Sequence, residues 1–182
     1  MNMEKKIYIG SDTAGYPLKL KCIEYLESKN IPYVDCGCDN NPDIEATRYP
    51  FFAAKVACAV SRGDARCGLL ICGTGIGMSM MANKFPGVRA ALLTSTYQAK
   101  MTRMHNDANL ICMGGMTAGE WEAIDILETF LNTEYDGAFH EGSLNLIKEA
   151  EEFMGNGQLW EKEPYKICTG ALKDSEIFDR KK

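Results

Sequence analysis

A thiol and a glycine-rich turn occur together in residues 69–84, LLICGTGIGMSMMANK. Cys72 ends an apolar run, and three glycines follow within five positions, before a segment of helical period: Gly73, Gly75 and Gly77. Glycines let several backbone N–H groups converge near a helix N-terminus, which favours a negatively charged oxygen there. The same positive end favours the thiolate form of Cys72. The stretch therefore predicts a reactive thiol beside a loop that binds a small anion.

The glycine spacing does not match the loops that hold nucleotides. It is G-x-G-x-G rather than G-x-G-x-x-G, and no Lys-Ser or Lys-Thr pair completes a P-loop. A thiolate base and amide donors suit proton abstraction next to a carbonyl, because the enediolate carries its charge on the carbonyl oxygen. Cys72 is the candidate base, and the Thr74 hydroxyl could join the oxyanion site. The alternative is structural: Cys72 fills space at a strand end and the glycines permit a tight turn.

The chain has two histidines, His105 and His140. His105 lies in RMHNDAN, just before a strand-like run. There it could move a proton onto a sugar ring oxygen, while Asn106 holds a hydroxyl. A lone histidine is more often a structural group, and this is the first interpretation for His140.

Short runs of β-favouring residues alternate with segments of helical period, which is typical of βαβ units and a parallel sheet. The strand-like runs cover residues 6–10, 31–37, 67–72, 88–93 and 108–115. One helix is expected ahead of Asn30, and others over 51–61, 76–84, 97–104 and 118–131. Right-handed crossovers place such helices on both faces of the sheet. A last amphipathic helix, 141–154, need not pack on the sheet of its own chain.

Length and composition limit the remaining functions. The 182 residues suit one domain, 1–154, with an extension, 155–182, that is expected to be partly disordered. The net charge of −5 without a basic stripe argues against nucleic-acid binding. No apolar stretch reaches the roughly 18 residues of a membrane span and no secretion signal is visible, so a cytoplasmic protein is expected. The eight cysteines include no C-x-x-C pair and are expected to be free thiols without a metal.

Four segments resemble one enzyme family: GSDTAGYPLK, YPFFAAKVA, LLICGTGIGMSMMANKFPGVRAAL and RMHNDANLICMGG. They are similar to the sugar-phosphate isomerases that comprise type B ribose-5-phosphate isomerases and galactose-6-phosphate isomerase subunits. The resemblance covers roughly residues 5–145 and favours the catalytic interpretation of Cys72. It implies a Rossmann-like three-layer α/β/α sandwich with a five-stranded parallel sheet and a C-terminal helical extension. It also implies an active site between two subunits, in a homodimer or a dimer of dimers.

The resemblance further implies an aldose-ketose isomerase that works through a cis-enediol without metal or organic cofactor. Cys72 would move the proton between C1 and C2, and loop 73–77 would stabilise the enediolate. His105 would open the sugar ring, and Asp12 would hold hydroxyls of the substrate. The other residues predicted to border the substrate are Thr13, Arg48, Tyr49, Arg103, Asn106 and His140.

The sequence departs from the family pattern at several positions that the resemblance assigns to phosphate binding. Thr13 stands where the family has histidine, and Met116 follows the Gly-Gly pair of strand five where arginine is expected. GAFHEGS carries Phe139 and either Gly142 or Ser143 at two further arginine positions. Each charge-assisted contact of this kind contributes about 1.5 to 3 kcal/mol. The sequence therefore predicts an intact proton-transfer site with altered phosphate recognition.

Three explanations of the missing arginines stay open. Other cations of this chain, Arg48 and Arg103, could bind the phosphate, although most exposed arginines are solvated without a specific duty. A second subunit of a hetero-oligomer could supply the arginines. The substrate could also be a hexose, a tetrose or an unphosphorylated sugar instead of the default, ribose 5-phosphate. An alternative from another class is a sugar-binding subunit without catalytic activity.

Overall fold

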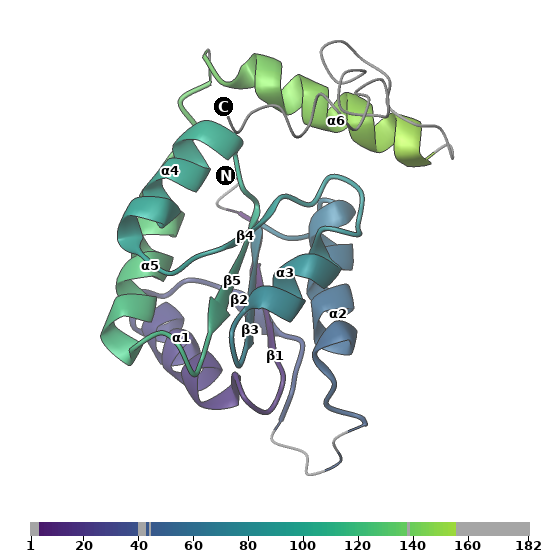
Figure 1. Ribbon diagram of the computed structural model, residues 1–182. Helices are drawn as coiled ribbons and strands as arrows, with labels where there is room; N and C mark the ends of the chain where they lie inside the picture. The colour runs from purple at the N-terminus through teal and green to yellow at the C-terminus, as the bar shows by residue number, and fades with distance from the viewer. Residues whose placement is uncertain (1–3, 40–42, 44, 138, 156–182) are drawn as a thin grey trace, which may run out of the picture. The chain divides into compact units, whose positions relative to one another are not determined.

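Five parallel strands form a sheet whose two faces are covered by helices (Figure 1). The computed structural model describes residues 4–39, 43, 45–137 and 139–155. The elements in chain order are β1 (Ile7–Ser11), α1 (Tyr16–Ser28), β2 (Tyr33–Asp35), α2 (Tyr49–Ser61), β3 (Cys67–Cys72), α3 (Ile76–Ala82), β4 (Ala90–Leu92), α4 (Thr96–Asn106), β5 (Leu110–Gly114), α5 (Glu120–Asn132) and α6 (Glu141–Gly155). The α/β class and the five-stranded parallel sheet confirm the fold predicted from the sequence.

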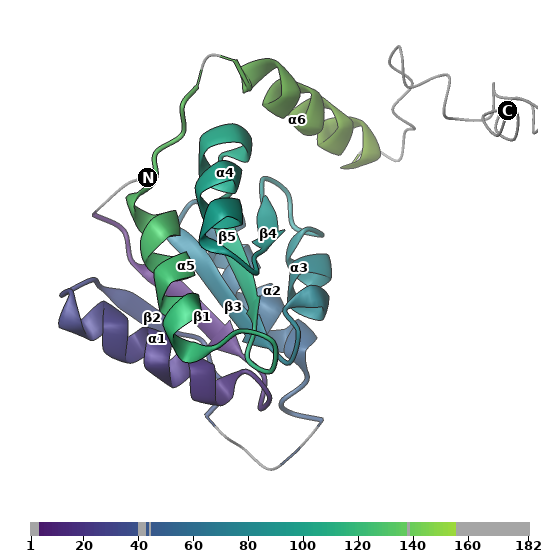
Figure 2. The ribbon, with the colours of Figure 1, turned by 60° about the vertical axis from the view of Figure 1, so that its left-hand side comes forward.

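The strand order is β2-β1-β3-β5-β4, and each neighbouring pair is parallel. β3 lies in the middle, and its register with β5 pairs Gly68 with Leu110 and Cys72 with Gly114. Figure 2 shows α1 and α5 in front of the sheet and α2 and α3 beyond it. Because helices cover both faces, every residue of β3 and β5 is buried, as expected for strands that are continuous apolar runs.

The side chains of β3 alternate between two buried cores. Leu69 and Ile71 belong to the core beneath α1, α4 and α5, whereas Leu70 and Cys72 belong to the core beneath α2 and α3. This alternation directs the thiol of Cys72 to the α2 and α3 face, at the carboxyl end of the strand. In open parallel sheets, this end is where ligands bind.

The outer strands are shorter than the sequence predicts. Strands are predicted over 31–37 and 88–93, but the structure has three residues in each, Tyr33–Asp35 and Ala90–Leu92. Each outer strand pairs with one neighbour only, so fewer ladder hydrogen bonds define its ends. Helix boundaries shift less: the helix predicted over 76–84 ends at Ala82, and the one predicted over 97–104 spans Thr96–Asn106.

α6 belongs to a second compact unit, which begins at Glu141. No side chain of α6 is buried, and the exposed apolar ones are Leu146, Ile147, Phe153 and Met154. The predicted extension from 155 onward lies almost wholly outside the described residues, so the division at 154 stays a prediction. Among the helices that the structure describes, none is both long and apolar enough to cross a membrane.

A buried arginine fixes the end of α4. Arg103 is 2% exposed, and its guanidinium donates to the carbonyl oxygens of Ala108 at 2.6 Å and Thr133 at 3.2 Å. The same group donates to the carboxylate of Asp107 at 2.8 Å, which also accepts a bond of 2.7 Å from Arg89. These bonds join the end of α4 to the segment that follows α5. The prediction that Arg103 binds substrate therefore competes with a clear role in the fold.

Arg103→Ala should lower the free energy of unfolding by about 3 kcal/mol, because it removes a buried side chain and leaves the carbonyl oxygens of Ala108 and Thr133 without this donor. Urea unfolding followed by circular dichroism measures the change. Arg62→Ala is the matched control, since Arg62 is exposed and its loss should change stability by no more than about 0.5 kcal/mol. A loss of activity at unchanged stability would instead support the substrate-binding role of Arg103.

Candidate functional site

The thiol of Cys72 lies at the start of the glycine loop. Cys72 is 6% exposed, and its Sγ accepts a hydrogen bond of 3.1 Å from the backbone N–H of Gly75. Gly75 precedes α3 with a φ of +77°. A Cβ there would lie 2.5 Å from a side-chain carbon of Leu92 and 2.9 Å from the backbone of Met113. Only glycine permits both this conformation and this close approach. The hydrogen bond from residue 75 to the sulfur therefore requires glycine at this position.

The loop is held against the turn that follows β5. Gly115 N–H donates to the carbonyl oxygen of Cys72 at 2.8 Å, and Met116 N–H donates to that of Gly73 at 3.0 Å. A Cβ on Gly114 would lie 2.8 Å from the backbone of Thr74, so the two segments touch through their main chains. The Thr74 hydroxyl is exposed and accepts a bond of 3.4 Å from Ile76 N–H. Main-chain hydrogen bonds therefore hold the glycine loop against this turn.

Asp12 lies beside the end of β3, on the loop after β1. Its backbone N–H donates to the carbonyl oxygen of Ile71 at 3.2 Å, and its carboxylate accepts a bond of 2.9 Å from Gly15 N–H. Burial raises the pKa of this carboxyl above its ordinary value of 3.8, and the backbone hydrogen bonds oppose the rise. Thr13 follows and is exposed. The structure thus brings Asp12, Thr13 and Cys72 to one edge of the sheet.

Tyr49 begins α2 and packs on the glycine loop. A Cβ on Gly77 would lie 2.8 Å from Cζ of Tyr49, so the ring lies against the first turn of α3. Arg48 precedes it and is exposed, with its guanidinium paired to Glu45 at 2.5 Å. Tyr49 thus joins the group at the Cys72 edge, whereas Arg48 forms a surface ion pair.

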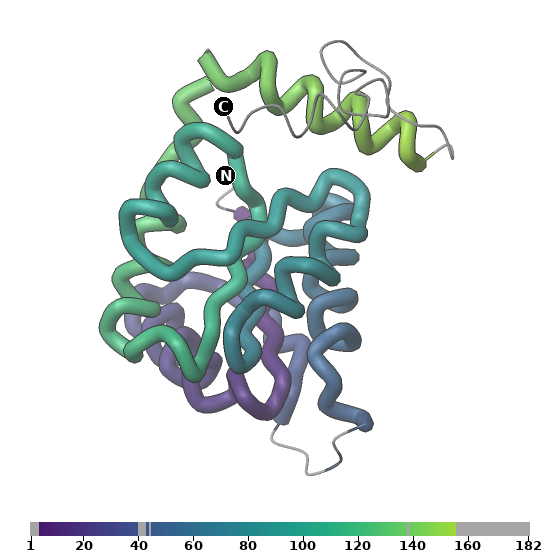
Figure 3. Tube along the Cα trace, viewed as in Figure 1, coloured from purple at the N-terminus to yellow at the C-terminus, as the bar shows by residue number. Residues whose placement is uncertain are grey.

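His105 and Asn106 lie at the opposite end of the sheet from Cys72, where the parallel strands begin. They end α4, and the chain then continues into β5 (Figure 3). β5 begins at Leu110, which pairs with Gly68 at the start of β3. Cys72 lies four residue steps along β3 from Gly68, which is about 13 Å at roughly 3.3 Å per step. One chain therefore does not bring the predicted ring-opening histidine to the predicted base.

His140 lies against His105. The two rings are stacked, with centroids 4.1 Å apart, and the ring of Phe139 meets that of His140 edge-on. Asp136 lies on the same segment, within reach of both histidines. Asp136 was not predicted from the sequence, because no local spacing connects it to His105.

Apolar side chains occupy two positions where the resemblance predicts arginine. Met116 is 76% exposed, and its Sδ lies 3.4 Å from where a Cβ of Gly73 would be. Phe139 is 89% exposed. Met116 therefore borders the glycine loop at a position where the resemblance predicts arginine.

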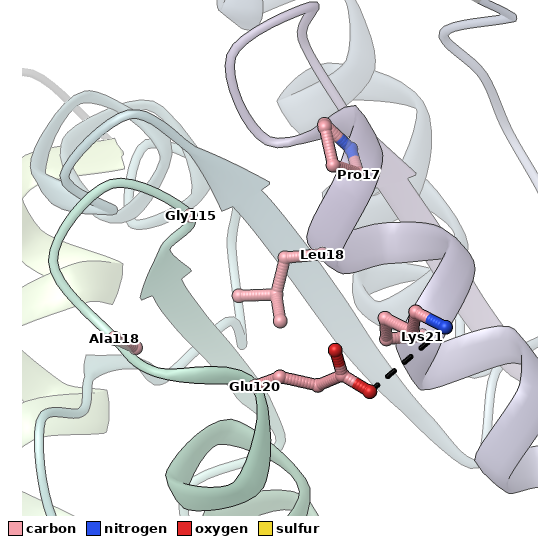
Figure 4. A pocket seen from close by; sticks show the side chains of 6 residues that line it. All are labelled: Pro17, Leu18, Lys21, Gly115, Ala118 and Glu120. Atoms are coloured by element: carbon pink, nitrogen blue, oxygen red, sulfur yellow. Dashed lines mark ion pairs between the residues drawn. The ribbon is translucent and has the colours of Figure 1, made fainter.

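A pocket of about 210 Å³ opens between α1 and the start of α5 (Figure 4). It is lined by Pro17, Leu18, Lys21, Gly115, Ala118 and Glu120. Lys21 and Glu120 form an ion pair of 3.9 Å across it. Leu18 belongs to the core on the α1 side, opposite to the core that includes Cys72, so the thiol does not line this pocket. The pocket is therefore separate from the candidate site.

The chain is similar over most of its length to characterised protein families. A model of the Ribose/Galactose Isomerase family matches residues 7–147. The protein named ribose-5-P isomerase B from Listeria innocua is 40% identical over 147 residues, which cover 81% of this chain and 97% of that protein. The solved structure of ribose-5-phosphate isomerase B from Clostridium thermocellum is 42% identical, with a TM-score of 0.77, and the match covers 81% of this chain and 97% of that one.

A further relative is named for a different sugar. The 4-deoxy-4-sulfo-D-erythrose isomerase from Clostridium sp. (strain MSTE9) is 38% identical over 151 residues. The match covers 82% of this chain and 93% of that protein. Proteins named for different substrates are thus similar to this chain at nearly the same identity.

Asp12→Asn should raise the free energy of unfolding at pH 7. The pKa of Asp12 is raised in the folded state, so the native protein disfavours the ionised carboxylate, and this cost is present at every pH above the raised pKa. The gain should shrink as the pH falls through the raised pKa and be lost below pH 3.8, where Asp12 is protonated in both states. Urea unfolding at several pH values measures it, with exposed Asp64→Asn as control. A variant less stable than wild type at pH 7 would contradict this explanation.

Proposed function

The chain belongs to the Ribose/Galactose Isomerase family, and we propose that it interconverts an aldose phosphate and a ketose phosphate through a cis-enediol. The default substrate pair is ribose 5-phosphate and ribulose 5-phosphate. The observation that carries the proposal is the hydrogen bond from Gly75 N–H to Sγ of Cys72, at the end of the middle strand. It supports a thiolate held beside backbone donors, which is what proton abstraction next to a carbonyl requires.

Cys72 is the proposed base. Its thiolate takes the proton from C2 of the open-chain aldose, the C1–C2 double bond forms, and negative charge moves to the C1 oxygen. Donors of the glycine loop stabilise this charge: the N–H groups of Gly73, Gly75 and Gly77 and the hydroxyl of Thr74. A proton then moves from the C2 hydroxyl to the C1 oxygen, which passes through the cis-enediol and leaves the charge on the C2 oxygen. The Cys72 thiol returns its proton to C1 as the C2 carbonyl forms, so the ketose and the thiolate result. Neither step requires a metal or an organic cofactor.

Two copies of the chain form each proposed site. His105 opens the sugar ring, and the separation of about 13 Å along β3 between the two sheet edges supports its contribution from a second copy. Asn106 of this second copy enters the site together with His105. Asp12, Thr13 and Tyr49 come from the same copy as Cys72 and hold hydroxyls of the substrate. A homodimer in the cytoplasm is therefore part of this proposal.

A four-carbon sulfonated sugar is the second candidate substrate. The Clostridium relative named 4-deoxy-4-sulfo-D-erythrose isomerase supports it, together with Met116 and Phe139 at positions where the resemblance predicts arginine. A sulfonate carries one negative charge at neutral pH, whereas a phosphate monoester carries between one and two, so a site with fewer cations favours the sulfonate. Of the two cations predicted to bind the anionic group, Arg48 is paired with Glu45. Arg103 is buried and donates to Asp107, Ala108 and Thr133.

Proton exchange at C2 tests the proposed function. In deuterated water, the wild-type protein should replace the C2 proton of ribose 5-phosphate, which NMR detects as loss of that signal. Cys72→Ala should slow exchange at least about 100-fold, the lower end for a positioned base. Cys58→Ala is the matched control, since this partly buried thiol lies on α2. Undiminished exchange in Cys72→Ala would exclude Cys72 as the base. Binding without exchange for every sugar tested would favour a sugar-binding subunit.

Met116→Arg should lower the KM for a phosphorylated sugar about tenfold, because one charge-assisted hydrogen bond contributes about 1.5 kcal/mol. The KM for the unphosphorylated sugar should not change. Met116→Gln, of similar length but without charge, is the control. An equal effect of Met116→Arg on both sugars would place residue 116 away from the anionic group.

A further inference from the structure

Two imidazoles and a carboxylate lie together near the start of β5. His105 lies in the last turn of α4, and Asp136 and His140 lie in the segment that follows α5. One ligand atom from each side chain lies within 4.8 Å of the others. Within the described ranges, no other group of histidine, cysteine and acidic side chains meets this condition.

The chemistry of the three side chains suits a divalent transition metal. Imidazole nitrogens and carboxylate oxygens are common Zn²⁺ ligands, and three protein ligands leave a fourth tetrahedral position for water. With metal–ligand bonds of about 2.0 to 2.1 Å, the ligand atoms of a tetrahedral site lie about 3.4 Å apart. The three groups would therefore close by no more than about 1.4 Å, which rotation of the side chains can supply.

The backbone that carries these side chains is held in place. Asp136 N–H donates to the carbonyl oxygen of Met104 at 3.3 Å, and His140 N–H donates to that of Gly137 at 3.2 Å. Arg103 links the end of α4 to Thr133 at the start of the same segment. A site whose ligands lie on mutually bonded elements loses less conformational entropy when it binds a metal. We propose that His105, Asp136 and His140 form a binding site for Zn²⁺ or a similar divalent transition-metal ion.

A metal ion at this site would inhibit the isomerase. This consequence rests on the proposed function, in which a ring nitrogen of His105 moves a proton during ring opening. A coordinated nitrogen has no lone pair for that proton, so the metal and the cyclic sugar exclude one another. Removal of the ion by a chelator restores the free imidazole. The cluster would thus make the ring-opening step sensitive to free zinc.

NMR of the two imidazoles tests the binding site directly. The chain has only two histidines, so spectra of the full-length protein contain two sets of imidazole signals, and both belong to the proposed site. Titration with Zn²⁺ should shift both sets together. Thiols also bind Zn²⁺, and imidazole signals distinguish this site from binding at the free cysteines. Unchanged imidazole signals at saturating Zn²⁺ would overturn the proposal.

Variants of single ligands sharpen the test. Removal of a residue that hydrogen-bonds to a metal ligand weakens metal binding about 10- to 100-fold. Removal of the ligand itself should weaken binding at least as much. Asp136→Asn and His140→Ala should therefore raise the Kd for Zn²⁺ by at least about tenfold. Glu134→Gln, an exposed acid on the same segment, should bind as wild type. Equal affinity in all three variants would contradict the assignment.

Activity measurements separate the metal site from the proposed function. Without metal, Asp136→Asn should isomerise at the wild-type rate. With Zn²⁺ at the wild-type Kd, the wild-type protein should lose half its activity on a cyclic substrate, and Asp136→Asn should lose little. Equal inhibition of both proteins would assign the effect to another site, such as the thiol of Cys72. If the wild type shows no isomerase activity at all, the imidazole titration still decides whether the metal binds.

Discussion

Two backbone hydrogen bonds join the end of β3 to the turn after β5, from Gly115 N–H to Cys72 and from Met116 N–H to Gly73. They fix the path of the glycine loop, and this path brings Gly75 N–H to the sulfur. The glycine loop can approach the turn after β5 this closely because residue 114 has no side chain. A Cβ on Gly114 would lie 2.8 Å from the backbone of Thr74. The position of the thiol thus depends on Gly75 and Gly114, where a side chain would meet the neighbouring backbone.

The parallel sheet imposes the second constraint, which separates the two groups that the proposed mechanism uses. Every strand runs in the same direction, so residues after a strand and residues before a strand lie at opposite edges. Cys72 follows β3, and His105 precedes β5. Packing within one chain cannot bring them together, and the buried bonds of Arg103 hold the end of α4 where it is. An active site that uses both residues therefore needs two copies.

The sequence predicts the parts of the structure that depend on local pattern. The alternation of apolar runs and helical segments predicts the parallel sheet, and the position of Cys72 at the end of a buried run predicts its place at the carboxyl edge. Burial is harder to predict: Arg103 resembles a surface cation in the sequence, and only its bonds to Ala108 and Thr133 show its structural role. The group of His105, Asp136 and His140 could not be predicted either, because it depends on how the segment after α5 returns to α4. The lengths of the outer strands depend on pairing partners that no local pattern specifies.

The most direct test of the two-copy account is complementation between inactive variants. Cys72→Ala and His105→Ala are mixed in equal amounts and allowed to exchange subunits, which native mass spectrometry verifies, and turnover of a cyclic sugar phosphate is measured. Because half of the dimers are then mixed and each mixed dimer has one intact site of two, activity should recover to about one quarter of wild type. Cys72→Ala mixed with the double variant Cys72→Ala/His105→Ala has no intact site and should stay inactive. A verified mixture of the two single variants that remains inactive would contradict the account.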